Sequence, residues 1–234
     1  VESRNYKGIS LCTPAWLARI FPKGSFARNV GMLTGGTAFA QGIAILVTPV
    51  LTRLYTPEDF NPLAVYISTI GLLSVAASLR YNIAIPLPVR DDEAISLLAL
   101  SCLSAGVTAL LAATPIIFSP EWVAGLLGYR SIAPYLWMVP IGVFLAATYD
   151  ALQFWATRKN RLALITRTRM TRALFGSGTQ LAIGAVHHSP FGLIFGHMVY
   201  CGMGMIGLTR SLLRDDRDFL RSLSITEILS AAKG

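Results

Sequence analysis

The chain has little charge, and the charge that it has is unevenly spread. Only 14% of its 234 residues are Asp, Glu, Lys or Arg, whereas 53% are hydrophobic. A soluble globular domain usually carries about 25% charged residues, so this composition excludes an ordinary soluble protein. The apolar excess predicts a protein whose surface faces lipid.

Cysteine and acidic residues are also scarce. The three cysteines are too few and too far apart for a disulfide framework or a metal-ligand spacing. The one compact acidic cluster, residues 91–93, could hold a divalent metal for a glycosyltransferase. We interpret it as a helix start, where acids favour the positive end of the helix dipole, because no second cluster could complete a metal site. The chain is therefore expected not to be an enzyme and to hold no metal or cofactor.

Five long stretches contain no charge at all: residues 30–52, 61–79, 94–120, 131–149 and 173–209. Roughly 20 helical residues cross a bilayer core of about 30 Å, so the first four stretches suit one span each. The fifth is too long for one span, and the turn signature HHSPFG at 187–192 divides it. The sequence therefore predicts an all-α polytopic membrane protein with six transmembrane helices, at about 30–52, 61–79, 94–117, 133–155, 172–187 and 191–209.

The Lys and Arg residues fall almost entirely on one side of these six spans. Of the 20, only Arg53 and Arg130 lie on the other side. Lys and Arg in short loops stay in the cytoplasm, so residues 1–29 and 210–234 are expected to be cytoplasmic segments. The net charge of +8 therefore needs no nucleic acid to explain it, although a basic inner face would also attract anionic membrane lipids.

The first predicted span carries a polar stripe. Thr34, Thr37, Gln41, Thr48 and Thr52 fall within an arc of roughly 60° at about 100° per residue. Such a stripe should face protein or water rather than lipid. Hydrogen bonding to another helix and the wall of a transport pathway explain it equally well.

Helix-start signals follow the first span. Thr56 is a predicted cap and Pro57 a first helical residue, with acids next to the positive helix end. Pro62 follows so closely that we expect the helix to break there and to restart with Asn61 as its cap.

Asp150 is the one acid within a predicted span, near its cytoplasmic end. Ionisable residues inside spans are costly and often functional. A transport role and a structural pairing with a basic loop residue such as Arg167 are both open.

Several short motifs occur in a recognisable order. They are Arg28-Asn29-Val30, Gly36-Thr37-Ala38, Ala40-Gln41, the run from Thr52 to Phe60, Leu79-Arg80-Tyr81, Ala84-Ile85-Pro86-Leu87-Pro88, Glu93-Ala94, Phe154-Trp155, Arg158-Lys159, Gly192-Leu193-Ile194 and Gly196. In order and spacing they resemble the polysaccharide and O-antigen flippases (Wzx type) of the MATE-like exporter superfamily, from Arg28 to the end.

This resemblance implies transport of an undecaprenyl-pyrophosphate-linked oligosaccharide across the bacterial inner membrane, by alternating access around a cavity between two six-helix halves. By analogy, Arg53, Arg80 and Gln41 are candidates for substrate binding, because arginine neutralises and hydrogen-bonds phosphate. Interfacial snorkelling explains the two arginines as well. The chain would correspond to the amino-terminal half, and its first residue, which is not Met, indicates that this end is incomplete too. It is expected to need the second half or a second copy. The alternatives are a non-transporting remnant or membrane scaffold and, behind these, a membrane glycosyltransferase.

Overall fold

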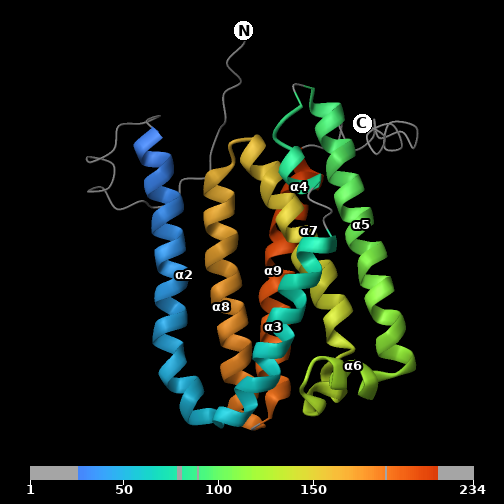
Figure 1. Cartoon of the computed structure of the whole chain (residues 1–234). Coiled ribbons are helices and arrows are strands. Elements are labelled where there is room, and N and C mark those ends of the chain that lie inside the picture. Colours follow the sequence, from blue (N-terminus) through green and yellow to red (C-terminus); the bar gives the residue numbers. More distant parts are fainter. Residues whose placement is uncertain (1–25, 78–80, 89, 188, 216–234) are drawn as a thin grey trace.

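A computed structural model describes residues 26–77, 81–88, 90–187 and 189–215 (Figure 1). This part of the chain is helical and contains no β-strand. Its long helices are α2 (Phe26–Leu54), α3 (Pro57–Ala77), α5 (Asp91–Phe118), α7 (Met138–Arg158), α8 (Leu162–Val186) and α9 (Pro190–Asp215). Its short helices are α4 (Tyr81–Ala84), α6 (Pro120–Leu126) and the 3-10 helix η1 (Arg130–Tyr135). The prediction of an all-helical chain is confirmed for these residues.

The long helices run up and down beside one another (Figure 1). Helix α8 packs between α2 and α9, α7 contacts α5 and α9, and α3 packs against α5, α7 and α9. The turns from α2 to α3 and from α8 to α9 lie at the lower end as drawn, together with α6 (Figure 1). Arg53 and Arg130 belong to this lower end, because they lie in the last turn of α2 and at the start of η1.

Four helices are long and apolar enough to cross a membrane: Gly31–Leu54, Pro57–Ala77, Glu93–Phe118 and Pro190–Arg214. Large apolar side chains such as Leu46 and Leu72 are mostly exposed on them, as suits a lipid-facing surface. Helices α7 and α8 overlap the fourth and fifth predicted spans but carry more polar and charged residues. The apolar helices support a membrane protein.

Helices α8 and α9 approach each other through glycine. A Cβ atom added at Gly196 would lie 3.0 Å from the carbonyl oxygen of Gly176 and 3.1 Å from the backbone nitrogen of Gln180, and would also overlap the Gln180 side chain. Backbone therefore meets backbone here, as is common where membrane helices associate through small residues.

Helix α8 begins ten residues before the predicted span boundary, at Leu162 instead of 172. The prediction placed Arg167 and Arg169 in a loop and Arg172 at the start of the span; the loop assignment was wrong, because all three lie on the helix. Arginine is a good helix former, so a charge need not end a span when the fold supplies partners for it. The other bounds differ by six residues or fewer; for example, α7 begins at Met138 rather than 133, because η1 occupies the preceding residues, and α9 continues to Asp215 rather than 209.

The start of α3 confirms one prediction and corrects another. The Thr56 N–H and hydroxyl donate to Asp59 Oδ2 at 2.9 and 2.8 Å, and the helix begins at Pro57. The expected break at Pro62, with Asn61 as a new cap, is wrong, because α3 runs unbroken to Ala77. A proline close to the helix start removes only one backbone hydrogen bond, and the Pro62 ring is fully buried.

Tyr55 connects the turn between α2 and α3 to the turn between α8 and α9 at the lower end. Its hydroxyl donates to the carbonyl oxygen of Gln180 at 2.8 Å. A Cβ atom at Gly184 or at Gly192 would overlap the Tyr55 ring or hydroxyl, so the two glycines make room for it. Burial, and to a lesser extent the charge of Asp59, raises the pKa of Tyr55, which keeps the hydroxyl a neutral donor.

Candidate functional site

The four residues predicted from the sequence to bind substrate do not form one cluster. Arg53 is exposed in the last turn of α2 at the lower end, and Gln41 is exposed in the middle of α2. Asp150 is exposed on α7. Arg80 lies outside the described residues. The charge of Arg172 acts on the carboxyl group of Asp150. The cation is thus Arg172, not Arg167 as suggested by the sequence.

Arg172 lies inside the bundle, between α7, α8 and α9. Its Cζ atom is 3.8 Å from the ring centroid of Tyr149 and 4.1 Å from that of Tyr200, and its Nε–H donates to the Tyr200 carbonyl oxygen at 3.1 Å. A Cβ atom at Gly204 would overlap both Arg172 and Tyr149, so glycine makes room for this packing. The two rings and the carbonyl hold the guanidinium in one orientation, through cation–π contacts that strengthen when water is excluded.

Arg172 is also deep within the bundle. At 1.5 Å per residue it lies about 15 Å along α8 from Leu162, which is about half the thickness of a bilayer core. A charge packed among aromatic side chains inside a protein is costly unless it has partners, and the two rings and the Tyr200 carbonyl oxygen supply them here.

Arg169, one turn closer to the upper end, connects α8 to α2. Its Nη1–H donates to the Thr37 hydroxyl at 2.8 Å. Beside it, the Thr166 hydroxyl donates to the Met32 carbonyl oxygen at 3.3 Å, and a Cβ atom at Gly36 would overlap the Thr166 side chain. One member of the α2 polar stripe therefore makes the interhelical hydrogen bond that the sequence suggested.

The rest of the stripe does not bond to another helix in the described structure. The Thr48 and Thr52 hydroxyls donate to carbonyl oxygens of α2 itself. Thr34 and Gln41 are exposed and have no hydrogen-bond partner among the described residues. Within the described structure, Thr37 is thus the member of the stripe that meets α8, and the other four lie exposed on α2.

The sequence contained a signal for the two arginines that we did not use. Arg169, Arg172, Gly176 and Gln180 are spaced by three, four and four residues, and this helical repeat crosses the predicted boundary between loop and span.

Around the two arginines, the hydroxyl groups of Thr148 and Tyr149 are buried without a hydrogen-bond partner in the described part of the chain. His197 packs against the rings of Tyr66 and Tyr200. The arrangement is cationic and rich in donors, so it suits an anionic ligand.

Metal ligands are not grouped here: the described residues contain no set of three or more His, Cys, Asp or Glu that could hold an ion. The acid at position 91 instead joins an ion-pair network at the upper end of the bundle.

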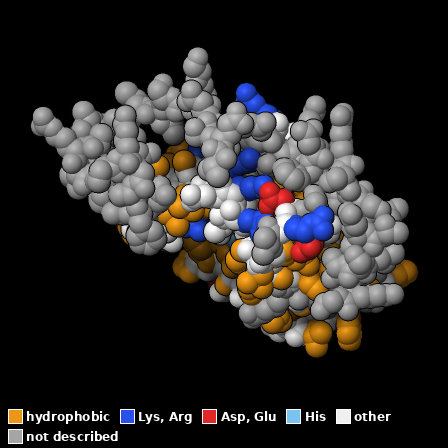
Figure 2. Space-filling view, turned by 90° about the horizontal axis from the view of Figure 1, so that it is seen from above, with side chains coloured by type: hydrophobic (Ala, Val, Ile, Leu, Met, Phe, Trp, Pro, Cys, Tyr) orange, Lys and Arg blue, Asp and Glu red, His pale blue; other side chains and the backbone are white. Residues whose placement is uncertain are grey.

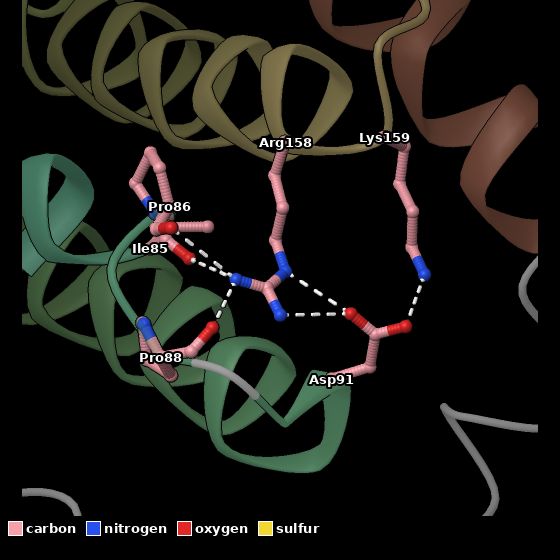
Figure 3. A network of polar contacts seen from close by, with 6 residues as sticks. All are labelled: Ile85, Pro86, Pro88, Asp91, Arg158 and Lys159. Atoms are coloured by element: carbon pink, nitrogen blue, oxygen red, sulfur yellow. Dashed lines mark hydrogen bonds and ion pairs between the residues drawn. The ribbon is translucent and has the colours of Figure 1, made fainter.

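This network connects the end of α7 to the start of α5 (Figure 3). Arg158 Nη2 and Lys159 Nζ lie 2.9 and 2.6 Å from the two Asp91 carboxylate oxygens. Arg158 Nη1 donates to the carbonyl oxygens of Ile85, Pro86 and Pro88. Asp91 therefore begins α5, as predicted, but its carboxylate is also held by two cations. Two of the motifs that suggested the family resemblance, residues 84–88 and Arg158-Lys159, meet in this network.

Lys and Arg side chains gather near the middle of the upper end, with carboxylates between them (Figure 2). The basic residues at the junction of α7 and α8 are Arg158, Lys159 and Arg161. Among the described residues, these three basic side chains lie at the upper end, whereas Arg53 and Arg130 lie at the lower end.

The pKa of Asp91 predicts a pH effect on stability. The hydrogen bond from Lys159, followed by that from Arg158, lowers this pKa below its usual value of about 3.9. The stabilisation is therefore fully present above about pH 4 and is lost as the pH falls through the lowered pKa. We expect Asp91→Asn to lower the unfolding free energy at pH 7 by about 1 kcal/mol, since the carboxylate is partly exposed to water. The loss should shrink as the pH falls below 4.

Thermal unfolding in detergent across this pH range measures the effect. Glu121→Gln is the control, because Glu121 is exposed at the opposite end and its replacement should change little. An Asp91→Asn deficit that is equal at all pH values would contradict the ionic explanation.

Comparison with protein-family models, with curated proteins and with solved structures finds no match for this chain.

Proposed function

We propose that this chain is a membrane transporter that moves an undecaprenyl-pyrophosphate-linked oligosaccharide, such as an O-antigen unit, across the bacterial inner membrane. The observation that carries this proposal is the pair Arg169 and Arg172 on α8, inside an otherwise apolar bundle. A pyrophosphate crossing the membrane must exchange water for fixed cations and hydrogen-bond donors. Arginine supplies both, in a geometry that matches phosphate oxygens.

The two arginines have different roles in this proposal. Arg172 is held by aromatic rings and a backbone carbonyl, so it is a fixed positive centre at mid-depth. Among the described residues, the Arg169 side chain is held by one hydrogen bond, to the Thr37 hydroxyl, and a phosphate oxygen can replace this acceptor. We assign direct phosphate binding to Arg169. Arg172 contributes a fixed positive charge that attracts the phosphate without contacting it. Asp150, Gln41, Arg53 and Arg80 are assigned secondary contacts along the path.

The proposed topology has six spans with both termini in the cytoplasm. All six long helices cross the bilayer, and α7 and α8 do so because their polar residues face protein or the substrate path. The upper end, with Arg158, Lys159 and Arg161, faces the cytoplasm in accordance with the distribution of Lys and Arg.

A second six-helix half, or a second copy of this chain, completes the transporter. The supporting feature is α2, which packs against α8 and in which only Gly36 and Leu51 are buried among residues 31–54. Lipid cannot satisfy the exposed amide of Gln41. A partner placed across this surface would enclose a polar path between the two halves, as in the MATE-like architecture. The chain performs transport without enzymatic chemistry.

Arg169→Gln tests the proposal directly. With the chain in lipid nanodiscs, we expect this change to weaken the binding of a polyprenyl pyrophosphate by about tenfold, because a charge-assisted hydrogen bond contributes about 1.5–3 kcal/mol. Titration of the pyrophosphate, followed by native mass spectrometry, measures the affinity. The polyprenyl monophosphate should bind the unaltered protein more weakly than the pyrophosphate does, and Arg169→Gln should lower its affinity by a smaller factor.

Arg167→Gln is the matched control, because it removes the same charge from the same helix at an exposed position. Equal losses of affinity in Arg169→Gln and Arg167→Gln would mean that binding depends only on the net charge of the protein. No binding by the unaltered chain, together with failure to support polysaccharide export in a flippase-deficient cell, would favour a membrane scaffold or remnant. Turnover of a nucleotide-sugar donor would revive the glycosyltransferase.

A further inference from the structure

A short segment at the lower end exposes a stripe of large apolar side chains. Trp122 and Leu126 lie one turn apart on α6, and Phe118 is the last residue of α5. Their side chains are 64%, 73% and 81% exposed, respectively. We call these three residues the α6 stripe. On the opposite side of α6, Ala124 is fully buried and Val123 packs against the hydrophobic core, so the orientation of the helix is fixed.

The surroundings of the α6 stripe change from apolar to polar over a short distance. Exposed Leu110, Leu111 and Ile117 continue the apolar surface upward along α5. Ser119, Glu121 and Arg130 are exposed beside the stripe. Trp137, which precedes α7, is half exposed at the same end. An apolar surface that ends in tryptophan and charge is the pattern of a membrane interface, where indole rings lie at the level of the lipid headgroups.

The position and length of α6 exclude a spanning role. The helix has seven residues, and it lies at the lower end of the bundle near the ends of α5 and α7 (Figure 1). Seven residues extend about 10 Å, a third of a bilayer core.

We propose that α6 is an interfacial anchor, whose stripe inserts into the headgroup and acyl-chain boundary of the leaflet that meets the lower end. Lipid is the occupant because the stripe is continuous with the apolar face of α5, a helix that is apolar and long enough to span the membrane. A second copy or another protein would have to cover that face of α5 as well. The inference does not rest on the transport function.

Fluorescence quenching by brominated lipids tests the depth of Trp122. The chain has four tryptophans, and replacing Trp16, Trp137 and Trp155 with Phe leaves Trp122 as the only emitter. In phosphatidylcholine vesicles, bromine near the ester end of the acyl chain should quench Trp122 at least about twofold more than bromine near the terminal methyl, since an interfacial side chain lies about 5–10 Å into the boundary. Aqueous iodide should quench it weakly.

A second comparison avoids changing the buried Trp155. Trp122→Phe alone should remove most of the quenching by the shallow bromine from the four-tryptophan protein, and Trp137→Phe should remove a smaller part, because Trp137 is less exposed. Strong iodide quenching with no effect of bromine would place α6 in water and overturn the proposal. Protection from both quenchers that increases with protein concentration would also overturn it, in favour of a second copy.

Discussion

Gly196→Leu should largely remove the folded protein from membranes. The added side chain would meet the Gly176 carbonyl oxygen, the Gln180 backbone nitrogen and the Gln180 side chain. Backbone cannot move aside as a flexible side chain can, so α8 and α9 would have to separate. Overpacking costs about 1–3 kcal/mol when neighbours can adjust, and we expect more here because the obstacle is a helix. Protein abundance in membranes and thermal unfolding in detergent measure the loss.

Gly178→Leu is the control for this prediction. It makes the same change on α8, at a position where an added Cβ meets nothing within 4 Å. Its abundance should equal that of the unaltered protein. If both variants are lost to the same extent, leucine itself, and not the α8–α9 contact, is the cause.

Arg172→Gln should reduce transport by tenfold or more, the largest activity effect of any single charge in the bundle. The change removes a fixed cation that lies deep among apolar helices, where water screens its field poorly, and each lost factor of ten corresponds to about 1.4 kcal/mol. Transfer of a fluorescent polyprenyl-pyrophosphate sugar between leaflets of reconstituted vesicles measures the rate.

Arg172→Lys separates the effect of charge from that of packing. Lysine keeps the charge but lacks the planar group that lies between the Tyr149 and Tyr200 rings. We therefore expect an intermediate rate and a lower melting temperature. A normal transport rate in Arg172→Gln, accompanied by reduced stability alone, would show that Arg172 serves only the fold.

The sequence predicted those helices that are marked by a long apolar run. Helices α2, α3, α5 and α9 each contain a charge-free run that is long and apolar enough to cross a bilayer. The start of α3 was also predictable, because Thr56 and Asp59 interact over three residues. Where a feature depends on distant partners, the prediction failed or stayed open.

Arg172 illustrates the limit. The sequence predicts it only as the first residue of a span, because its partners Tyr149 and Tyr200 are far away along the chain. Thr37 and Gln41 illustrate a second limit. Both lie on one helical stripe, yet Thr37 meets Arg169 while Gln41 is exposed. The boundary between the two environments depends on where α8 crosses α2, which no local pattern contains.

The attachment of Tyr55 has a mechanical consequence for α2. Its hydroxyl bond to Gln180 and its seat between Gly184 and Gly192 fix the lower end of α2 to both α8 and α9. Thr37 lies about 27 Å further along α2, at 1.5 Å per residue. Any tilt of α2 is therefore a rotation about Tyr55, and displacement grows with distance from it. A tilt of α2 that leaves the Tyr55 hydrogen bond intact would still separate Thr37 from Arg169. The Arg169 side chain would then be free to bind another group, although the other end of α2 had hardly moved.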